Sequence, residues 1–228
     1  MKAKLQLIVG MFFLLCFIKF PTIIEGKSEK EVSMKPTLTL IGHASMKIKT
    51  AEGVVIYIDP YYDGDYSDPA DIILSTHEHF DHNVIEKVTK KPDCVVKRVA
   101  DALNPDLSHN SFDIKGVKIE AVTAGGNQNH HPDNTVGYLV SFDGLTVYHP
   151  GDTSKIPEMA ALKNRNIDYA FFPIDGVYNM GPEEATECAN LIGAKHNTPM
   201  HFFDADPMKF TPANLLRMNY GDTIELSA

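Results

Sequence analysis

The sequence predicts one α/β (α+β) domain in which two β-sheets pack face to face and helices cover the outside. Of its 228 residues, 43% are hydrophobic, which is enough for one sizeable core. Short strand-type runs alternate with helix-type segments, and strands dominate the first half. The chain shows neither a repeat nor a low-complexity linker, so we expect a single fold over residues 37–228.

Ten segments have the length and composition of β-strands, being short and rich in β-branched or aromatic residues. In chain order they are Leu38–Ile41, Val54–Ile58, Asp71–Leu74, Cys94–Val96, Val117–Val122, Val136–Phe142, Leu145–Tyr148, Tyr169–Phe172, Thr198–Met200 and Thr223–Leu226. Asp143-Gly144 lies between two of these runs and predicts a tight β-hairpin.

Four segments predict helices, and the third carries the clearest signals. They are Asn83–Thr89, Ile156–Lys163, Pro182–Ile192 and Pro212–Met218. Pro182 suits a first helical turn, and the two glutamates after it favour the positive end of the helix dipole. Cys188 falls on the apolar stripe of this helix, which indicates a buried core residue. A disulfide with Cys94 is the alternative if the protein is exported.

Residues 1–26 predict a secretory signal peptide. Lys2 and Lys4 precede an apolar run over residues 7–18, which is shorter than the ~20 residues of a membrane-spanning helix. An uncleaved N-terminal anchor is the alternative, and we expect membrane attachment only in that case. The charged residues 27–36 predict a flexible lead-in. The protein is therefore expected to be exported, as a periplasmic, extracellular or membrane-anchored protein.

The charge of the chain argues against nucleic-acid binding. The formal net charge is −9, and it becomes −11 without the first 26 residues, which carry three lysines and one glutamate. Nucleic-acid binding without sequence preference depends on neutralising phosphates with lysine and arginine. We therefore expect a small-molecule substrate and no nucleic-acid partner.

The segment Thr76–His82 carries the strongest chemical signal in the chain. It reads Thr-His-Glu-His-Phe-Asp-His and directly follows a predicted strand, so His77, His79, Asp81 and His82 would gather at one sheet edge. Neutral imidazole and carboxylate are ligands that zinc and similar divalent ions prefer. The alternative, a solvated histidine-rich loop, does not explain four candidate ligands within six residues.

The pattern His-x-His-x-Asp-His after a strand resembles the metal motif of the metallo-β-lactamase superfamily. More narrowly, it is similar to small metal-dependent hydrolases related to ascorbate-6-phosphate lactonase. The resemblance continues in the expected order through Thr39–Ser45, Ile58–Pro60, Tyr148–Thr153, Phe172–Ile174, Tyr178–Ala185 and Pro199–Phe202. It implies a four-layer αββα sandwich in which loops from both sheets meet at one edge.

The remaining ligand candidates lie far along the chain from this segment. Asp152 follows Gly151, which allows a tight turn, and suits a carboxylate that bridges two ions. His201 matches the last metal histidine of the resembled branch. That branch also places a ligand just before a proline, which favours His131 over His130 and leaves His130 as the alternative. His43 and Asp59 are candidates to orient a ligand histidine through its other ring nitrogen.

These residues together predict a binuclear hydrolase. His77, His79 and His131 would hold one divalent ion, Asp81, His82 and His201 the other, and Asp152 would bridge. Zinc is the expected metal, with manganese or iron as alternatives.

The resemblance then implies attack by a metal-bound hydroxide on an ester, lactone, phosphodiester or similar bond. Asp81 would be catalytic by accepting a hydrogen bond from this hydroxide. Tyr178 is the tyrosine we favour at the mouth of the site. The alternative function is an exported metal-binding accessory protein with a degenerate substrate pocket.

Overall fold

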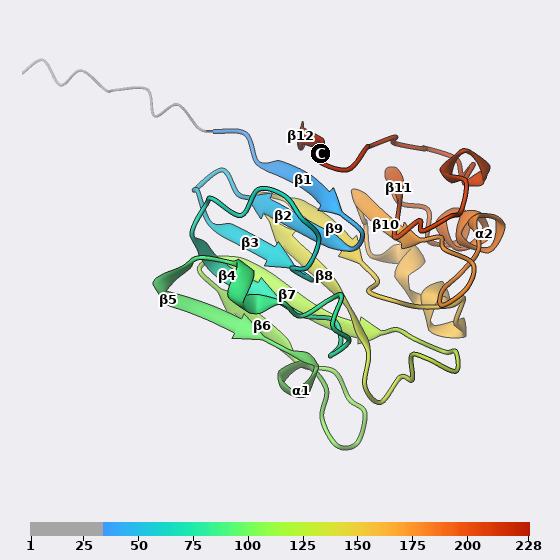
Figure 1. The fold of residues 1–228 in the computed structure, drawn as a ribbon, viewed down its shortest axis with the longest axis horizontal. Coiled ribbons are helices and arrows are strands. Elements are labelled where there is room, and N and C mark those ends of the chain that lie inside the picture. The colour runs from blue at the N-terminus through green and yellow to red at the C-terminus, as the bar shows by residue number, and fades with distance from the viewer. Residues whose placement is uncertain (1–33) are drawn as a thin grey trace, which may run out of the picture. The chain divides into compact units, whose positions relative to one another are not determined.

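The computed structural model describes residues 34–228, so the predictions for residues 1–26 and for most of the lead-in lie outside the described residues. Residues 34–228 form two six-stranded sheets that face each other (Figure 1). The predicted sandwich is thereby confirmed. Among the described helices, none has the length and apolar character that crossing a membrane requires. Cys94 and Cys188 are both free thiols.

The first sheet has the strand order β12-β1-β2-β3-β4-β5. Its strands are β1 (Thr37–Gly42), β2 (Ser45–Lys49), β3 (Val55–Ile58), β4 (Ala70–Leu74), β5 (Lys90–Lys97) and β12 (Thr223–Glu225). The pairs from β12 to β3 are antiparallel, whereas β3, β4 and β5 run parallel. The carboxyl ends of β1, β3 and β4 therefore lie at the same edge of the sheet.

The second sheet has the order β11-β10-β9-β8-β7-β6. Its strands are β6 (Ser111–Ile114), β7 (Val117–Thr123), β8 (Val136–Phe142), β9 (Leu145–His149), β10 (Tyr169–Pro173) and β11 (His196–Met200). Strands β9, β10 and β11 are parallel, and the others pair antiparallel. The predicted hairpin joins β8 to β9, with Asp143 and Gly144 both at positive φ as such a tight turn requires.

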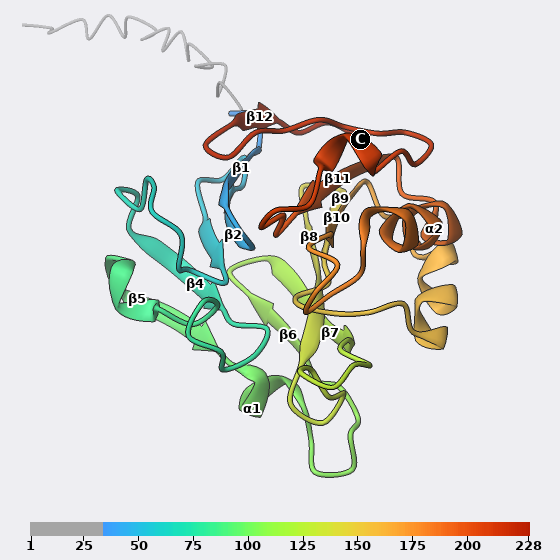
Figure 2. The same ribbon diagram turned by 45° about the vertical axis from the view of Figure 1, so that its right-hand side comes forward.

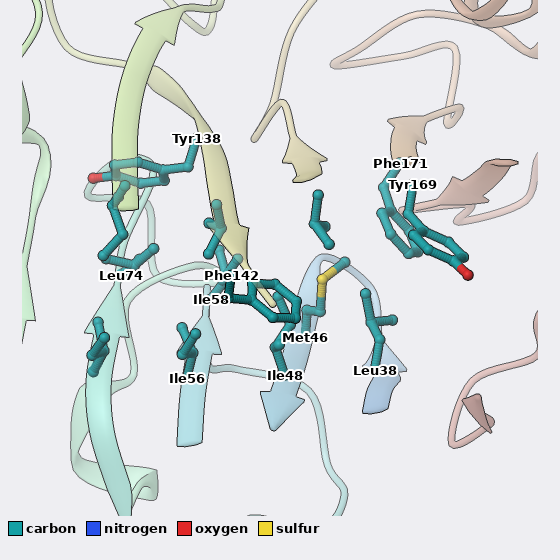
Figure 3. Close-up of a cluster of buried hydrophobic side chains, with 14 of the residues drawn as sticks. Leu38, Met46, Ile48, Ile56, Ile58, Leu74, Tyr138, Phe142, Tyr169 and Phe171 are labelled. Atoms are coloured by element: carbon teal, nitrogen blue, oxygen red, sulfur yellow. The ribbon is translucent and has the colours of Figure 1, made fainter. Parts of the chain in front are cut away.

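The two sheets bury a shared core between their facing sides (Figure 3). Alternate residues of each strand point inward, as the two-residue period of a strand demands. Ile56 and Leu74 from the first sheet pack in the same cluster as Tyr138, Phe142 and Phe171 from the second. This core holds the two sheets, and thus the loops at their common edge, in a fixed relation.

The outer faces differ between the two sheets. Helix α2 (Pro182–Ile192) and a 3₁₀ helix at Pro157–Asn164 cover the second sheet (Figure 2). Helix α2 has the predicted bounds and ends at Gly193, whose φ is 72°. The first sheet is covered on its outside by loop residues and the single turn Ile85–Lys87.

One predicted helix is much shorter than predicted, and another is wrong. The segment predicted over residues 83–89 shrinks to the turn Ile85–Lys87, and residues 212–218 form no helix. The latter segment instead lies along β11, where Leu216 donates its backbone hydrogen to the Asn197 carbonyl. Tertiary contacts override a weak helical pattern at this place. The short helix α1 (Val99–Ala102) follows β5.

Candidate metal centre

Acidic and histidine side chains gather where the two sheets present their strand ends. Asp59 follows β3, and the segment 76–82 follows β4. Asp152 follows β9, Asp175 follows β10 and His201 follows β11. Because these strands end at one edge, residues separated by more than a hundred positions become neighbours. This placement explains why residues so scattered in sequence can form one cluster.

Asp59 orients His82 directly and His77 through Thr76. Its carboxylate is fully buried and accepts hydrogen bonds from the backbone and hydroxyl of Thr76, at 2.8 and 2.7 Å. It also accepts from His82 Nδ1 at 2.8 Å, so His82 Nε2 points away from it. Since the Thr76 hydroxyl donates to Asp59, it accepts from His77 Nδ1 at 3.0 Å. Both rings therefore direct Nε2 toward the same interior space.

Asp152 is the carboxylate on which the second half of the cluster converges. Its oxygens lie 3.3 Å from His82 Nε2, 3.4 Å from His130 Nε2 and 3.3 Å from His201 Nε2. The preceding Gly151 has φ of 64°, and a Cβ there would approach Thr76 Cβ to 2.8 Å. A side chain at this position would push the two loops apart. Glycine is therefore required for Asp152 to reach the centre.

His201, which follows β11, lies against a carboxylate in the same way as His82, which follows β4. His201 Nδ1 lies 3.1 Å from Asp175 Oδ2, which directs its Nε2 toward Asp152. Asp175 is a site residue that sequence reasoning missed. Its signal was present in the sequence, because it is an acidic residue that comes two positions after a buried strand.

The candidate ligands form overlapping groups in which one potential ligand atom of each residue lies within 4.8 Å of the others. The groups are His77, His79 and His130; His77, His82 and Asp152; and His43, Asp81, His82 and His201. Asp152 lies beside members of the first and third groups. We call His77, His79, Asp81, His82, His130, Asp152 and His201 the ligand cluster.

The structure places His130, and not His131, in this cluster. The side chain of His131 is exposed, whereas His130 is 2% exposed and its Nε2 lies 3.2 Å from His79 Nδ1. Our choice of His131 rested on Pro132, which restricts the backbone of the residue before it but does not decide where that side chain points. Asn127 accepts hydrogen bonds from the backbone of this loop and turns His130 inward.

His43 contacts two members of the ligand cluster directly. Its Nε2 is 3.2 Å from Asp81 Oδ2, and its ring lies against that of His201 with 3.6 Å between ring centroids. Both histidines have positive φ, 55° and 52°, a strained conformation for residues other than glycine. The hydrogen bond to Asp81 agrees with an orienting role for His43.

Burial and carboxylates set the charges within the cluster. Burial lowers the pKa of His77 to about 3, so this ring is neutral at pH 7. Burial also disfavours a charged His201, but Asp152 and Asp175 outweigh it and raise its pKa to about 9. Likewise burial is outweighed by nearby carboxylates at His82, whose pKa rises well above its usual value. The cluster thus holds protons that a bound cation would displace.

The donor set fits divalent transition metals. His77 Nε2, His82 Nε2 and Asp152 Oδ1 are buried and have no hydrogen-bond partner among the described residues. Buried polar atoms without partners are costly, and each of these atoms is a good ligand for zinc, manganese or iron. The unsatisfied atoms are therefore explained if the cluster holds metal.

Five members of the ligand cluster, all except His77 and His82, form the floor of a pocket with a volume of 870 Å³. Pockets of this size hold small organic molecules. Its walls come from four loops that surround the cluster. The lining residues are His79, Phe80, Asp81, Asn129, His130, Asp152, Asp175, Val177, Tyr178, His201, Phe203, Asp204 and Ala205.

Comparisons with known proteins agree with this geometry. Residues 37–201 match the model of the beta-lactamase superfamily domain. A metal-dependent hydrolase of Thermococcus kodakarensis is 30% identical, and the alignment covers 82% of this chain and 92% of that protein. One from Nitratidesulfovibrio vulgaris is 32% identical over 74% of this chain and 81% of its own length.

Solved structures share the same fold. A protein of Parabacteroides distasonis has a TM-score of 0.68 and 30% identity, with 80% of this chain and 92% of that one covered. A metallo hydrolase of Ignicoccus hospitalis also has a TM-score of 0.68, at 21% identity, and covers 86% of this chain and 100% of its own. At that identity the likeness concerns the fold alone.

Proposed function

The chain belongs to the beta-lactamase superfamily and is a metal-dependent hydrolase, and we propose that it works with two divalent ions held by the ligand cluster. The observation that carries the proposal is the convergence of three histidine Nε2 atoms on Asp152, at 3.3 to 3.4 Å. A carboxylate between two groups of ring nitrogens can bridge two ions and offset their charge.

The proposed ligands divide into two sets. His77, His79 and His130 would hold one ion, while Asp81, His82 and His201 would hold the other, and Asp152 would bridge. Zinc suits this mixture of imidazole and carboxylate, with manganese or iron as the alternatives. When bound, the pair would supply a water nucleophile near neutral pH and polarise the scissile bond.

Asp81 is the residue we assign to the attacking water. Although it belongs to the ligand cluster, its carboxylate is partly exposed and lines the pocket, so it can also reach a substrate. Although burial favours the protonated form, the hydrogen bond from His43 outweighs it and lowers the pKa of Asp81 to about 2. Asp81 is therefore a carboxylate at neutral pH and can accept a hydrogen bond from the water and hold it in place.

The proposed reaction is hydrolysis of an ester, lactone, phosphodiester or similar bond in a small molecule. The pocket volume of 870 Å³ is consistent with such a substrate. We also propose export of the protein, which rests on the basic and apolar pattern of residues 1–26. Fractionation of cells of the native host, followed by N-terminal sequencing of the product, tests export and cleavage together.

Elemental analysis tests the proposed metal pair. We expect two transition-metal ions per chain after reconstitution of the purified protein with zinc, manganese or iron. A content below about one tenth of an ion per chain in every case would contradict the proposal. A hydrolysis screen with esters, lactones, phosphodiesters and β-lactams on the loaded protein then identifies the bond that is cleaved.

A further inference from the structure

Apolar side chains surround the mouth of the pocket above the ligand cluster. Within residues 34–228, four of the eight exposed large hydrophobic side chains line this one pocket. Phe80 is 75% exposed, Val177 70%, Phe203 57% and Tyr178 49%. We call these four residues the apolar rim. Single exposed apolar side chains are normal on a protein surface. Several gathered at one place indicate a binding surface.

The apolar rim is held in position by the same residues that support the ligand cluster. Phe203 lies against His201 and Tyr178, with ring centroids 5.0 and 5.9 Å apart. Asp175, which orients His201, also accepts hydrogen bonds from the backbone of Val177 and Tyr178 at 2.8 and 2.6 Å. The rim is therefore preorganised next to the proposed reacting centre.

The described residues that line the pocket offer no lysine or arginine to an anionic substrate. Asp175 and Asp204 are among these lining residues. Arg98, which follows β5, is engaged by Glu78 at 2.7 Å. A phosphate or carboxylate that lies away from the proposed ions would meet Asp175 and Asp204, with no lysine or arginine in the described lining to pair with it.

We propose that the substrate is an uncharged carboxylic ester or lactone that carries an aryl or alkyl group, and that this group packs on the apolar rim. The inference rests on the proposed function and specifies its substrate class. In the reaction the water oxygen forms a bond to the carbonyl carbon, the bond from that carbon to the alcohol oxygen breaks, and a proton from the water passes to the leaving alkoxide. An ester yields a carboxylic acid and an alcohol, and a lactone yields one hydroxy acid.

A series of 4-nitrophenyl esters tests this inference on the metal-loaded protein. Each methylene that reaches the rim should raise kcat/KM by about fourfold at most, so butyrate should exceed acetate by about tenfold. The mono-4-nitrophenyl ester of succinic acid, which has a charged end of similar length, should be at least about tenfold poorer than butyrate. Equal rates along the series, or a preference for the charged ester or for bis(4-nitrophenyl) phosphate, would overturn the substrate class and leave the hydrolase standing.

Val177→Ser is the informative variant, because Val177 lines the pocket and is not a member of the ligand cluster. We expect it to reduce the ratio of butyrate to acetate rates while the metal content stays at that of the unmodified protein. Leu107→Ser replaces another exposed apolar residue, 49% exposed and outside the pocket, and serves as the control. A ratio that changes equally in both variants, or in neither, would count against the rim.

Binding of the uncharged dye Nile red to the metal-free protein separates this inference from the proposed function. The dye should bind, and Val177→Ser should weaken its binding while Leu107→Ser should not. Dye binding that is absent, or insensitive to Val177, overturns the rim as an apolar site whether or not the protein hydrolyses esters. If the dye binds as expected but no ester, lactone or phosphodiester is cleaved, the proposed function fails and the ester assignment fails with it.

Discussion

The floor of the pocket and its rim are built on different principles, although they are only a few residues apart in sequence. On the floor, His130 and Asp152 are each 2% exposed, and each lies against polar partners. On the rim, Phe80 and Val177 are 75% and 70% exposed and contribute apolar surface. The floor can thus determine which reaction is possible, while the rim determines which molecule reaches it.

This difference predicts two kinds of mutational response. Changes on the floor should remove metal and activity together, because the ligands act as a unit. Changes on the rim should alter the preference among substrates and leave metal content unchanged. The following experiments test this separation, beginning with the largest expected effect.

Asp152→Ala should abolish activity and reduce the metal content from two ions per chain to one or none. Loss of this carboxylate removes the proposed bridge and leaves His82 and His201 without the charge that they both face. Elemental analysis and ester hydrolysis measure the two effects. Asp204→Ala, which removes a carboxylate from the pocket wall, is the control and should retain metal. An unchanged metal content in Asp152→Ala would show that Asp152 only shapes the turn.

His130→Ala should lose metal from the site formed with His77 and His79, whereas His131→Ala should keep it. The two residues are adjacent and chemically identical, so the pair is internally controlled. Only His130 is directed into the cluster, with its Nε2 3.2 Å from His79 Nδ1. Metal content per chain is the measurement. The reverse result would restore the ligand that the sequence alone favoured.

Asp175 serves the floor and the rim together, and two substitutions can separate its roles. Asp175→Asn keeps an oxygen that can accept from the loop backbone but can lose the acceptor for His201 Nδ1. Metal affinity should fall by about 10- to 100-fold, while Nile red binding persists. Asp175→Ala should weaken both. Equal loss of dye binding in the two variants would show that floor and rim are not separable at this residue.

Metal uptake should depend on pH, whereas dye binding to the rim should not. In the metal-free protein the nearby carboxylates raise the pKa of His201 to about 9, so the ring is protonated at neutral pH. A metal ligand must be neutral, so binding releases this proton. Affinity should then fall by at least about tenfold for each pH unit below that pKa, because His82 also holds a proton. Calorimetry in two buffers of different ionisation enthalpy measures the proton release, and equal heats in both would contradict it.

The sequence predicted the fold and the floor where the signal was local. The run 76–82 after an apolar strand, the Asp143-Gly144 turn and the bounds of α2 are all carried by neighbouring residues. Strands β2 and β6 were missed because each is a short run with charged or polar residues at alternate positions. The helix expected over residues 212–218 was lost to contacts with β11, which no local pattern reveals.

Two features could not be predicted from the sequence, because they depend on contacts between distant segments. They are the direction of His130 and His131, and the apolar rim. Gly125 is packed against the His130 carbonyl, where a Cβ would come within 2.6 Å, and this packing helps set the loop's direction. Nothing in the residues around Pro132 encodes it. Phe80, Val177 and Phe203 come from three separate loops, so only the fold brings them to one pocket.

The hydrogen bonds from the loop after β10 to Asp175 have a consequence for how this protein can change. They use the backbone N–H groups of Val177 and Tyr178, so every residue type except proline can make them at those two positions. New side chains can therefore be exchanged there without disturbing His201. Evolution, or a laboratory library randomised at these two positions, can explore new substrates while the reacting centre stays intact.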